Sequence, residues 1–172
     1  MPNASLAPIP DISILEQPLA DERSDAPAAL RVVEDRPKDI YSLAGNKVLL
    51  LEDDAAFKEI MTDFLQESGF EVMAVQNGVE GVHQVLASDF EVILCDMMMP
   101  TLPGDMFFRA VERMRPHLCE RFVFMTGHRG NQRINAFIDS VSGTVLAKPF
   151  RVHDLLEMID FVRLRAAVLM AA

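Results

Sequence analysis

The sequence predicts an α/β fold in which a doubly wound, five-stranded parallel sheet carries helices on both faces. From residue 46 on, short apolar runs alternate with segments whose apolar residues recur every three or four positions. The runs show little polar alternation, which is typical of strands buried on both faces. Short connections between successive parallel strands require right-handed crossovers, and these place helices on both sides of the sheet.

The elements follow one another in a regular order. Residues 47–51 are expected to form a buried strand, apolar from residue 48 on, and residues 56–67 show helical spacing until Gly69 ends the helix. By the same criteria we expect, in order, strand 70–75, helix 78–87, strand 91–95, helix 105–114, strand 122–125, helix 132–141, strand 144–147 and helix 152–165. We expect these strands to take the flavodoxin-like order 2-1-3-4-5.

The first 45 residues differ from the rest in composition. They hold six of the ten prolines, and eight acidic residues stand against four basic ones. Proline removes backbone donors and interrupts helices, and no apolar period is sustained there. We therefore predict a flexible, proline-rich N-terminal tail over residues 1–45 and a single domain over residues 46–168.

The composition of the chain limits the kinds of partner that the protein can bind. The 172 residues are 50% hydrophobic, enough for a core, and their net charge of −10 disfavours direct binding to nucleic acid or to anionic membranes. Cys95 and Cys119 show no metal-ligand spacing and suggest a reducing compartment. Neither a leader nor an apolar window long enough to span a membrane is visible. We expect a cytoplasmic protein without a membrane partner.

Polar residues stand at the carboxyl ends of four predicted strands. These are the acidic run 52–54, Asp96 followed closely by Pro100, the pair Thr126 and Gly127, and the pair Lys148 and Pro149. In the expected strand order these four strands are neighbours, so their ends converge on the crevice where open α/β sheets bind ligands.

The residue types at these strand ends suit phosphoryl transfer onto a carboxylate. Clustered carboxylates repel one another unless a divalent cation neutralises them, and oxygen ligands favour Mg²⁺. Asp96 would be the nucleophile, with Thr126 and Lys148 contacting the phosphoryl oxygens. Each residue also has an ordinary explanation: Asp96 as a turn cap, Thr126 as a strand-end residue, Lys148 as a surface lysine and the acids as a solvated charge run.

Four ordered motifs in one fold resemble a known family. The motifs are Glu52-Asp53-Asp54, Asp96 to Pro100 with Gly104, Thr126-Gly127 and Lys148-Pro149-Phe150. Together they resemble the receiver domain of two-component response regulators over about residues 46–166. The strand from Phe122 to Gly127 and the sequence after it are also similar to receivers of hybrid histidine kinases.

The resemblance implies a phosphoacceptor and a metal site. Asp96 would accept a phosphoryl group from a phosphohistidine on a histidine kinase or a histidine phosphotransfer protein. Asp53, Asp96 and the backbone carbonyl of Met98 would ligate Mg²⁺, and Glu52 would act through a metal-bound water. Asp54 would then be a first-turn residue or the N-cap of the following helix. The protein would be a phosphoacceptor and not an enzyme, with at most slow self-dephosphorylation.

The resemblance also implies a switch, with one departure. Lys148 would pair with the phosphoryl oxygens, and Thr126 would hydrogen-bond to one of them in the active state. Receivers commonly carry an aromatic residue at the switch position three residues before the lysine, where this chain has Val145. Phosphorylation could still move loops through Thr126. No output domain is expected after the last helix, so the signal would pass by contact to an unknown downstream protein.

Two further residues would set the lifetime of the phosphorylated form. Met98 and His128 stand two positions after Asp96 and Thr126, where they would flank the path of an attacking water. Met98 cannot orient water by hydrogen bonding, whereas a neutral His128 can. We expect slow dephosphorylation tuned by these two side chains, or else a Met98 that only packs and a solvated His128.

Other functions stay open. A Mg²⁺-dependent aspartyl-phosphate phosphatase also uses a strand-end aspartate, but it usually carries a second aspartate where this chain has Met98. A receiver-like binding module that is never phosphorylated is a further alternative, which Val145 leaves open. Nucleotide binding is the weakest, because no glycine-rich loop follows the first strand.

Overall fold

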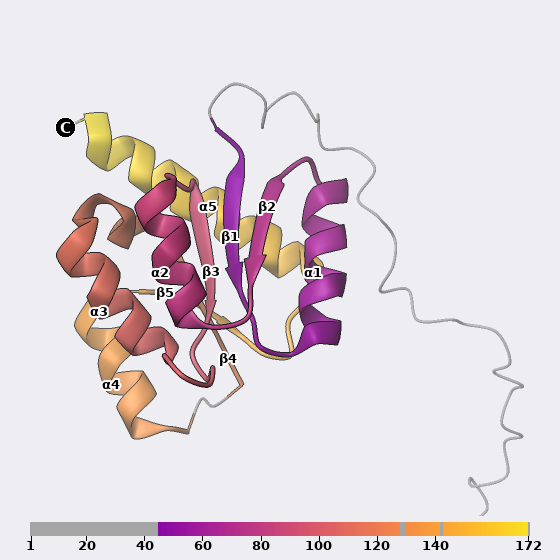
Figure 1. Cartoon of the computed structure of the whole chain (residues 1–172). Helices are drawn as coiled ribbons and strands as arrows, with labels where there is room; N and C mark the ends of the chain where they lie inside the picture. Colours follow the sequence, from indigo (N-terminus) through magenta and orange to yellow (C-terminus); the bar gives the residue numbers. More distant parts are fainter. Residues whose placement is uncertain (1–44, 128–129, 142, 172) are drawn as a thin grey trace, which may run out of the picture. The chain divides into compact units, whose positions relative to one another are not determined.

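The computed structural model describes residues 45–127, 130–141 and 143–171, so the expected tail at 1–44 lies outside it. In the described part, one parallel sheet has the order β2-β1-β3-β4-β5, which confirms the predicted order (Figure 1). Its strands are β1 (Lys47–Leu51), β2 (Glu71–Val75), β3 (Val92–Asp96), β4 (Phe122–Thr126) and β5 (Thr144–Ala147).

The helices follow the strands as predicted. They are α1 (Ala55–Glu67), α2 (Gly78–Ala87), α3 (Gly104–Met114), α4 (Gln132–Val141) and α5 (Val152–Ala171). Side-chain caps fix the starts of three of them, including α4, where Asn131 Oδ1 accepts from the Arg133 and Ile134 N–H groups at 3.0 and 3.3 Å. The Asp54 carboxylate accepts from the Phe57 N–H at 3.0 Å, which confirms Asp54 as the N-cap of α1, and Asn77 caps α2 in the same way.

Two apolar layers cover the sheet. Successive side chains of a strand point to opposite faces, so Leu49 and Leu51 pack in one layer and Val48 and Leu50 in the other. The first layer takes residues from α2, α3 and α4, and the second from α1 and α5. Figure 1 shows α5 behind the strands and α2 in front of them. This confirms a sheet with helices on both faces.

Two elements differ from the sequence expectation. A 3-10 helix, η3 (Pro116–Arg121), follows α3 where only a helix end was expected at Pro116. Leu118 is fully buried, and the Arg121 side chain donates to the Phe90 carbonyl at 2.8 Å, so tertiary contacts hold this turn. The last helix continues to Ala171 instead of ending near Arg165, and Ala166, just past the expected end, is still buried.

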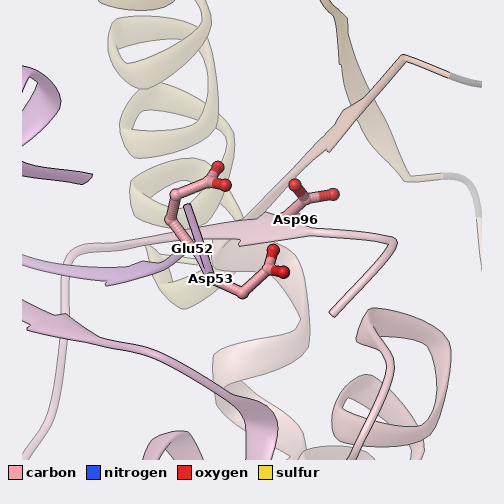
Figure 2. Close-up of side chains that lie close together, drawn as sticks. All are labelled: Glu52, Asp53 and Asp96. Atoms are coloured by element: carbon pink, nitrogen blue, oxygen red, sulfur yellow. The ribbon is translucent and has the colours of Figure 1, made fainter. Parts of the chain in front are cut away.

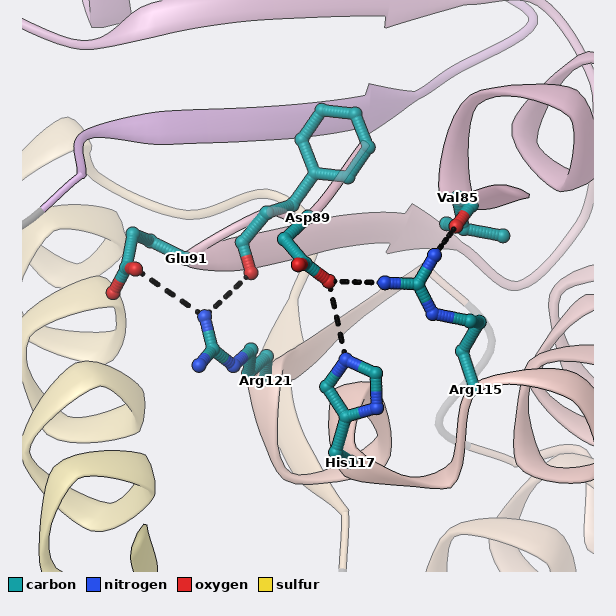
Figure 3. A network of polar contacts seen from close by, with 7 residues as sticks. Val85, Asp89, Glu91, Arg115, His117 and Arg121 are labelled. Atoms are coloured by element: carbon teal, nitrogen blue, oxygen red, sulfur yellow. Dashed lines mark hydrogen bonds and ion pairs between the residues drawn. The ribbon is translucent and has the colours of Figure 1, made fainter. Parts of the chain in front are cut away.

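A polar network joins η3 and the end of α3 to the connection between α2 and β3 (Figure 3). Arg115 donates to the Val85 carbonyl at 2.9 Å and to the Asp89 carboxylate at 2.5 Å. His117 Nε2 lies 3.1 Å from the same carboxylate. The network fixes the start of β3, whereas Asp96 stands at its other end.

Within the described ranges, none of the helices combines the length and the apolar character that crossing a membrane requires.

Candidate functional site

Three carboxylates meet at the carboxyl edge of the sheet (Figure 2). Glu52 and Asp53 directly follow β1, and Asp96 is the last residue of β3. One carboxylate oxygen from each lies within 4.8 Å of the others. Glu52 is 2% exposed and Asp96 is 7% exposed, while Asp53 is open to solvent. The structure thus brings together the acidic residues that the sequence predicted at two neighbouring strand ends.

The loop after β3 holds Asp96 in place. The Met98 N–H donates to Asp96 Oδ1 at 2.9 Å, and Met97 and Met99 on either side are buried. Gly104 is needed where this loop meets α3, because a Cβ there would lie 2.6 Å from the Asp96 carbonyl oxygen. The backbone of this loop therefore holds the Asp96 carboxylate through Oδ1.

One ammonium lies among the acids. Lys148 follows β5, and its Nζ is 2.7 Å from Glu52 Oε2 and 2.6 Å from Asp96 Oδ2. Its backbone N–H donates to the Thr126 carbonyl at 2.8 Å, which ties the loop after β5 to the end of β4. The Lys148–Pro149 peptide bond is cis.

Burial and neighbouring charges shift the pKa values of Glu52 and Lys148. Burial raises the pKa of the Glu52 carboxyl, although the hydrogen bond from Lys148 opposes part of the rise. Burial alone would lower the pKa of Lys148, but its hydrogen bonds and ion pairs with Asp96 and Glu52 outweigh burial and raise it. One cation for three carboxylates leaves the site with an excess of negative charge when all are ionised, and such a site attracts a further cation.

The donor set fits a magnesium ion. Octahedral Mg²⁺ holds oxygens at roughly 2.0–2.1 Å, so neighbouring ligand oxygens stand about 3 Å apart and opposite ones about 4 Å apart. The Asp53 and Asp96 oxygens lie within 4.8 Å of each other, close enough to share one such ion, and the Glu52 carboxylate stands beside them. All three are hard oxygen donors, which suits Mg²⁺ better than a transition metal. Asp53, the exposed member, leaves the cluster accessible from solvent.

The other predicted residues lie around this cluster. Thr126 is buried at the end of β4, one residue beyond Met125, the residue in register with Asp96. Val145 is half-buried on β5 opposite Phe124. Met98 is 48% exposed, and His128 lies outside the described residues.

One functional neighbour of the site, the aromatic ring of Phe57, could not be predicted from the sequence. The Phe57 ring centroid lies 4.8 Å from Lys148 Nζ, and the rings of Phe57 and Phe150 meet edge to face at 6.0 Å. A solvent-facing hollow of about 460 Å³ adjoins them, lined by Glu52, Asp54, Phe57, Lys148, Pro149 and Phe150. Phe57 had only the spacing of an apolar helix residue, which gives no sign of a neighbour after β5.

Comparisons with known proteins agree with this geometry. A family model described as the response regulator receiver domain matches residues 48–160. The response regulator receiver protein CpdR of Brucella abortus is 28% identical over 115 residues, which are 66% of this chain and 93% of CpdR. This chain spans only 18% to 49% of the length of three other curated relatives.

Solved structures show the same fold. The chemotaxis protein CheY4 of Vibrio cholerae is 27% identical, with a TM-score of 0.63 over 69% of this chain and 99% of that structure. The receiver domain of the sensor histidine kinase PA1611 from Pseudomonas aeruginosa is 22% identical, with a TM-score of 0.62 over 70% and 98%. The family model covers most of the chain, including β2 to β5 and all of β1 except its first residue, so the chain belongs to the family of response regulator receiver domains of two-component signalling.

Proposed function

We propose that the protein is a phosphoacceptor in a two-component phosphorelay, with Asp96 as the phosphorylated residue. The observation that carries this proposal is the Asp96 carboxylate at the sheet edge, beside two further acids and within 2.6 Å of the Lys148 ammonium. A nucleophilic carboxylate, a candidate cation site and a lysine are the groups that phosphoryl transfer to aspartate needs.

The transfer would exchange one bond for another. An Asp96 carboxylate oxygen attacks phosphorus as the P–N bond to the donor imidazole breaks, and the electron pair of that bond stays with the imidazole nitrogen. Lys148 then contacts a phosphoryl oxygen, and the buried Thr126 donates a hydrogen bond to another. The donor would be a histidine kinase or a histidine phosphotransfer protein. We place this activity in a domain over residues 46–168, acting in the cytoplasm.

Magnesium is the metal we propose for the acidic cluster. Asp53, Asp96 and the Met98 backbone carbonyl would hold the ion, with Glu52 acting through water. When bound, the ion supplies positive charge that offsets the charge on the phosphoryl oxygens. The structure of the PA1611 receiver, which has the same fold, contains magnesium coordinated in its active site cleft. We keep Val145 as the switch position and Met98 and His128 as residues that tune dephosphorylation.

The test is direct phosphorylation. We expect the protein, incubated with Mg²⁺ and a small phosphodonor, to gain one adduct of about 80 Da that is stable in acid and labile in alkali. The Asp96→Asn variant should fold and gain none, because the amide keeps the shape but lacks the nucleophilic charge. Asp63→Asn, which changes an exposed aspartate of α1, serves as the matched control and should be labelled fully.

The alternatives give other results in the same assay. A phosphatase would release phosphate from an added phosphomonoester over many turnovers, and a non-phosphorylated binding module would gain no adduct with or without Mg²⁺. Either result, or full labelling of Asp96→Asn, would contradict the assignment.

A further inference from the structure

We infer that Phe57 is a positioning residue that holds the Lys148 ammonium in place for phosphoryl transfer. This inference rests on the proposed function and deepens it, because Phe57 would act on the reaction only through Lys148. The residue lies on the first turn of α1, outside the motifs by which the site was predicted.

Three groups surround the ammonium. Two are carboxylate oxygens, Glu52 Oε2 at 2.7 Å and Asp96 Oδ2 at 2.6 Å, and the third is the face of the Phe57 ring, with its centroid at 4.8 Å. That distance lies within the range in which the negative face of an aromatic ring attracts a cation. The lysine side chain keeps only 24% of its exposure. The ring therefore closes a side of Lys148 that would otherwise face the solvent-filled hollow.

Two elements hold the ring itself. Phe150, two residues after Lys148, meets the Phe57 ring edge to face at an interplanar angle of 66°. The Phe57 N–H donates to the Asp54 cap at 3.0 Å, which fixes the backbone beneath the ring. Phe57 is thus held against Lys148 by the start of its own helix, α1, and by Phe150 in the loop between β5 and α5.

The ring has a specific use during transfer. Before transfer, Lys148 bonds to Asp96 Oδ2, and afterwards its ammonium must turn toward a phosphoryl oxygen. A carboxylate in the place of the ring would accept a hydrogen bond and fix the ammonium in one direction. A π face attracts the charge without accepting a strong directional hydrogen bond, so the ammonium can turn without entering solvent. A leucine of similar size would fill the space but provide no such attraction.

The test compares Phe57→Leu with Phe57→Tyr, each phosphorylated by a small phosphodonor at saturating Mg²⁺. We expect Phe57→Leu to be labelled about three- to tenfold more slowly, and Phe57→Tyr to stay within about twofold of the parent, because tyrosine keeps the π face. Magnesium affinity should stay within about twofold in both, since Phe57 does not contribute to the carboxylate cluster. Phe64→Leu, which removes a half-buried ring elsewhere on α1, is the control for packing alone.

A second measurement does not depend on phosphorylation. The Lys148 side-chain methylene protons next to the ring should resonate upfield in the parent and in Phe57→Tyr, and should move toward ordinary values in Phe57→Leu. Unchanged resonances in Phe57→Leu would overturn the inference, as would labelling at the parent rate or an equal loss in the leucine and tyrosine variants. If the parent protein gains no phosphoryl group while the resonances shift as expected, the proposed function fails and the placement of Lys148 by Phe57 stands.

Discussion

The Lys148 ammonium reaches Asp96 Oδ2 across 2.6 Å and so joins the ends of β5 and β3, although β4 lies between these strands. The same ammonium neutralises part of the charge of Glu52. A divalent cation drawn to the three carboxylates must therefore share them with a positive charge that is already present. In the proposed function, Lys148 would assist the phosphoryl group but oppose the metal, and substitution can separate the two effects.

Replacing Lys148 with methionine tests this opposition. We expect Lys148→Met to bind Mg²⁺ more tightly, by about threefold or more, because one unit charge at short range contributes on the order of 1 kcal/mol even in a high dielectric. We also expect at least about tenfold slower phosphorylation, because a phosphoryl oxygen loses its cation. Calorimetric Mg²⁺ titration suits this tryptophan-free chain. Lys47→Met, at an exposed ion pair with Glu71, is the control; weaker Mg²⁺ binding by Lys148→Met would refute the prediction.

Two adjacent aspartates should separate metal binding from helix capping. Asp53→Ala should lose most Mg²⁺ affinity and most phosphorylation while keeping its thermal stability in EDTA, since an exposed carboxylate is removed from a repelling cluster. Asp54→Ala should bind Mg²⁺ nearly as the parent does but lose about 1 kcal/mol of folding stability with the α1 cap. Denaturant melts and Mg²⁺ titrations of both variants test the pair. Equal losses of Mg²⁺ affinity in the two would contradict separate roles.

The exposed Met98 offers a test of the lifetime of the phosphorylated form. Its side chain cannot orient an attacking water, so Met98→Asn should shorten the life of the phosphoaspartate by about threefold or more through better placement of that water. The decay of the adduct is followed after removal of the phosphodonor, between pH 6 and pH 8. Met106→Asn, at another exposed methionine, is the control. Identical decay in the Met98 variant and the parent would leave packing as the only role of the Met98 side chain.

A methyl group at Gly104 should disturb the loop that carries Asp96. The added Cβ would stand 2.6 Å from the Asp96 carbonyl oxygen, a backbone atom that cannot move without shifting the loop. We expect Gly104→Ala to lose about 1–3 kcal/mol of stability, although alanine favours helices over glycine. It should also be phosphorylated more slowly. Gly130→Ala, where an added Cβ has no described atom within 4 Å apart from its chain neighbours, should stay within about 0.5 kcal/mol, and a similar cost at both sites would count against the clash.

The network around Asp89 predicts that the folding stability of the protein decreases slightly at acidic pH. The hydrogen bond with His117, aided by the charge of Arg115, holds the pKa of Asp89 below its usual range. A carboxyl with a depressed folded-state pKa stabilises the fold above its unfolded pKa of about 3.9 and loses this contribution as the pH falls through the folded pKa. Because Asp89 is largely exposed, the effect should stay below about 1 kcal/mol.

Denaturant melts of Asp89→Asn and the parent at pH 7, 5 and 3.5 measure this effect. The stability difference should be largest at pH 7 and 5 and should shrink at pH 3.5, while Asp63→Asn should show no such trend. A difference that grows toward low pH would have the wrong sign.

The sequence by itself determined the fold and the acidic edge of the site. Alternating apolar runs and helical periods specify strands and helices locally, and short parallel connections leave few topologies. Once the strand order is given, the ends of β1 and β3 must be neighbours. The sequence therefore predicts that Glu52, Asp53 and Asp96 lie close together, as they do.

Tertiary structure alone decided the contacts between side chains from distant segments. Phe57 and Lys148 are far apart in sequence, and nothing local to either residue shows that a ring of α1 faces the loop after β5. The short helix η3 could not be predicted for a similar reason. Pro116 locally favours a helix end, whereas contacts with distant residues, such as the burial of Leu118, stabilise the 3-10 helix. Periodicity records which face of an element is apolar, whereas lateral contacts depend on how whole elements pack.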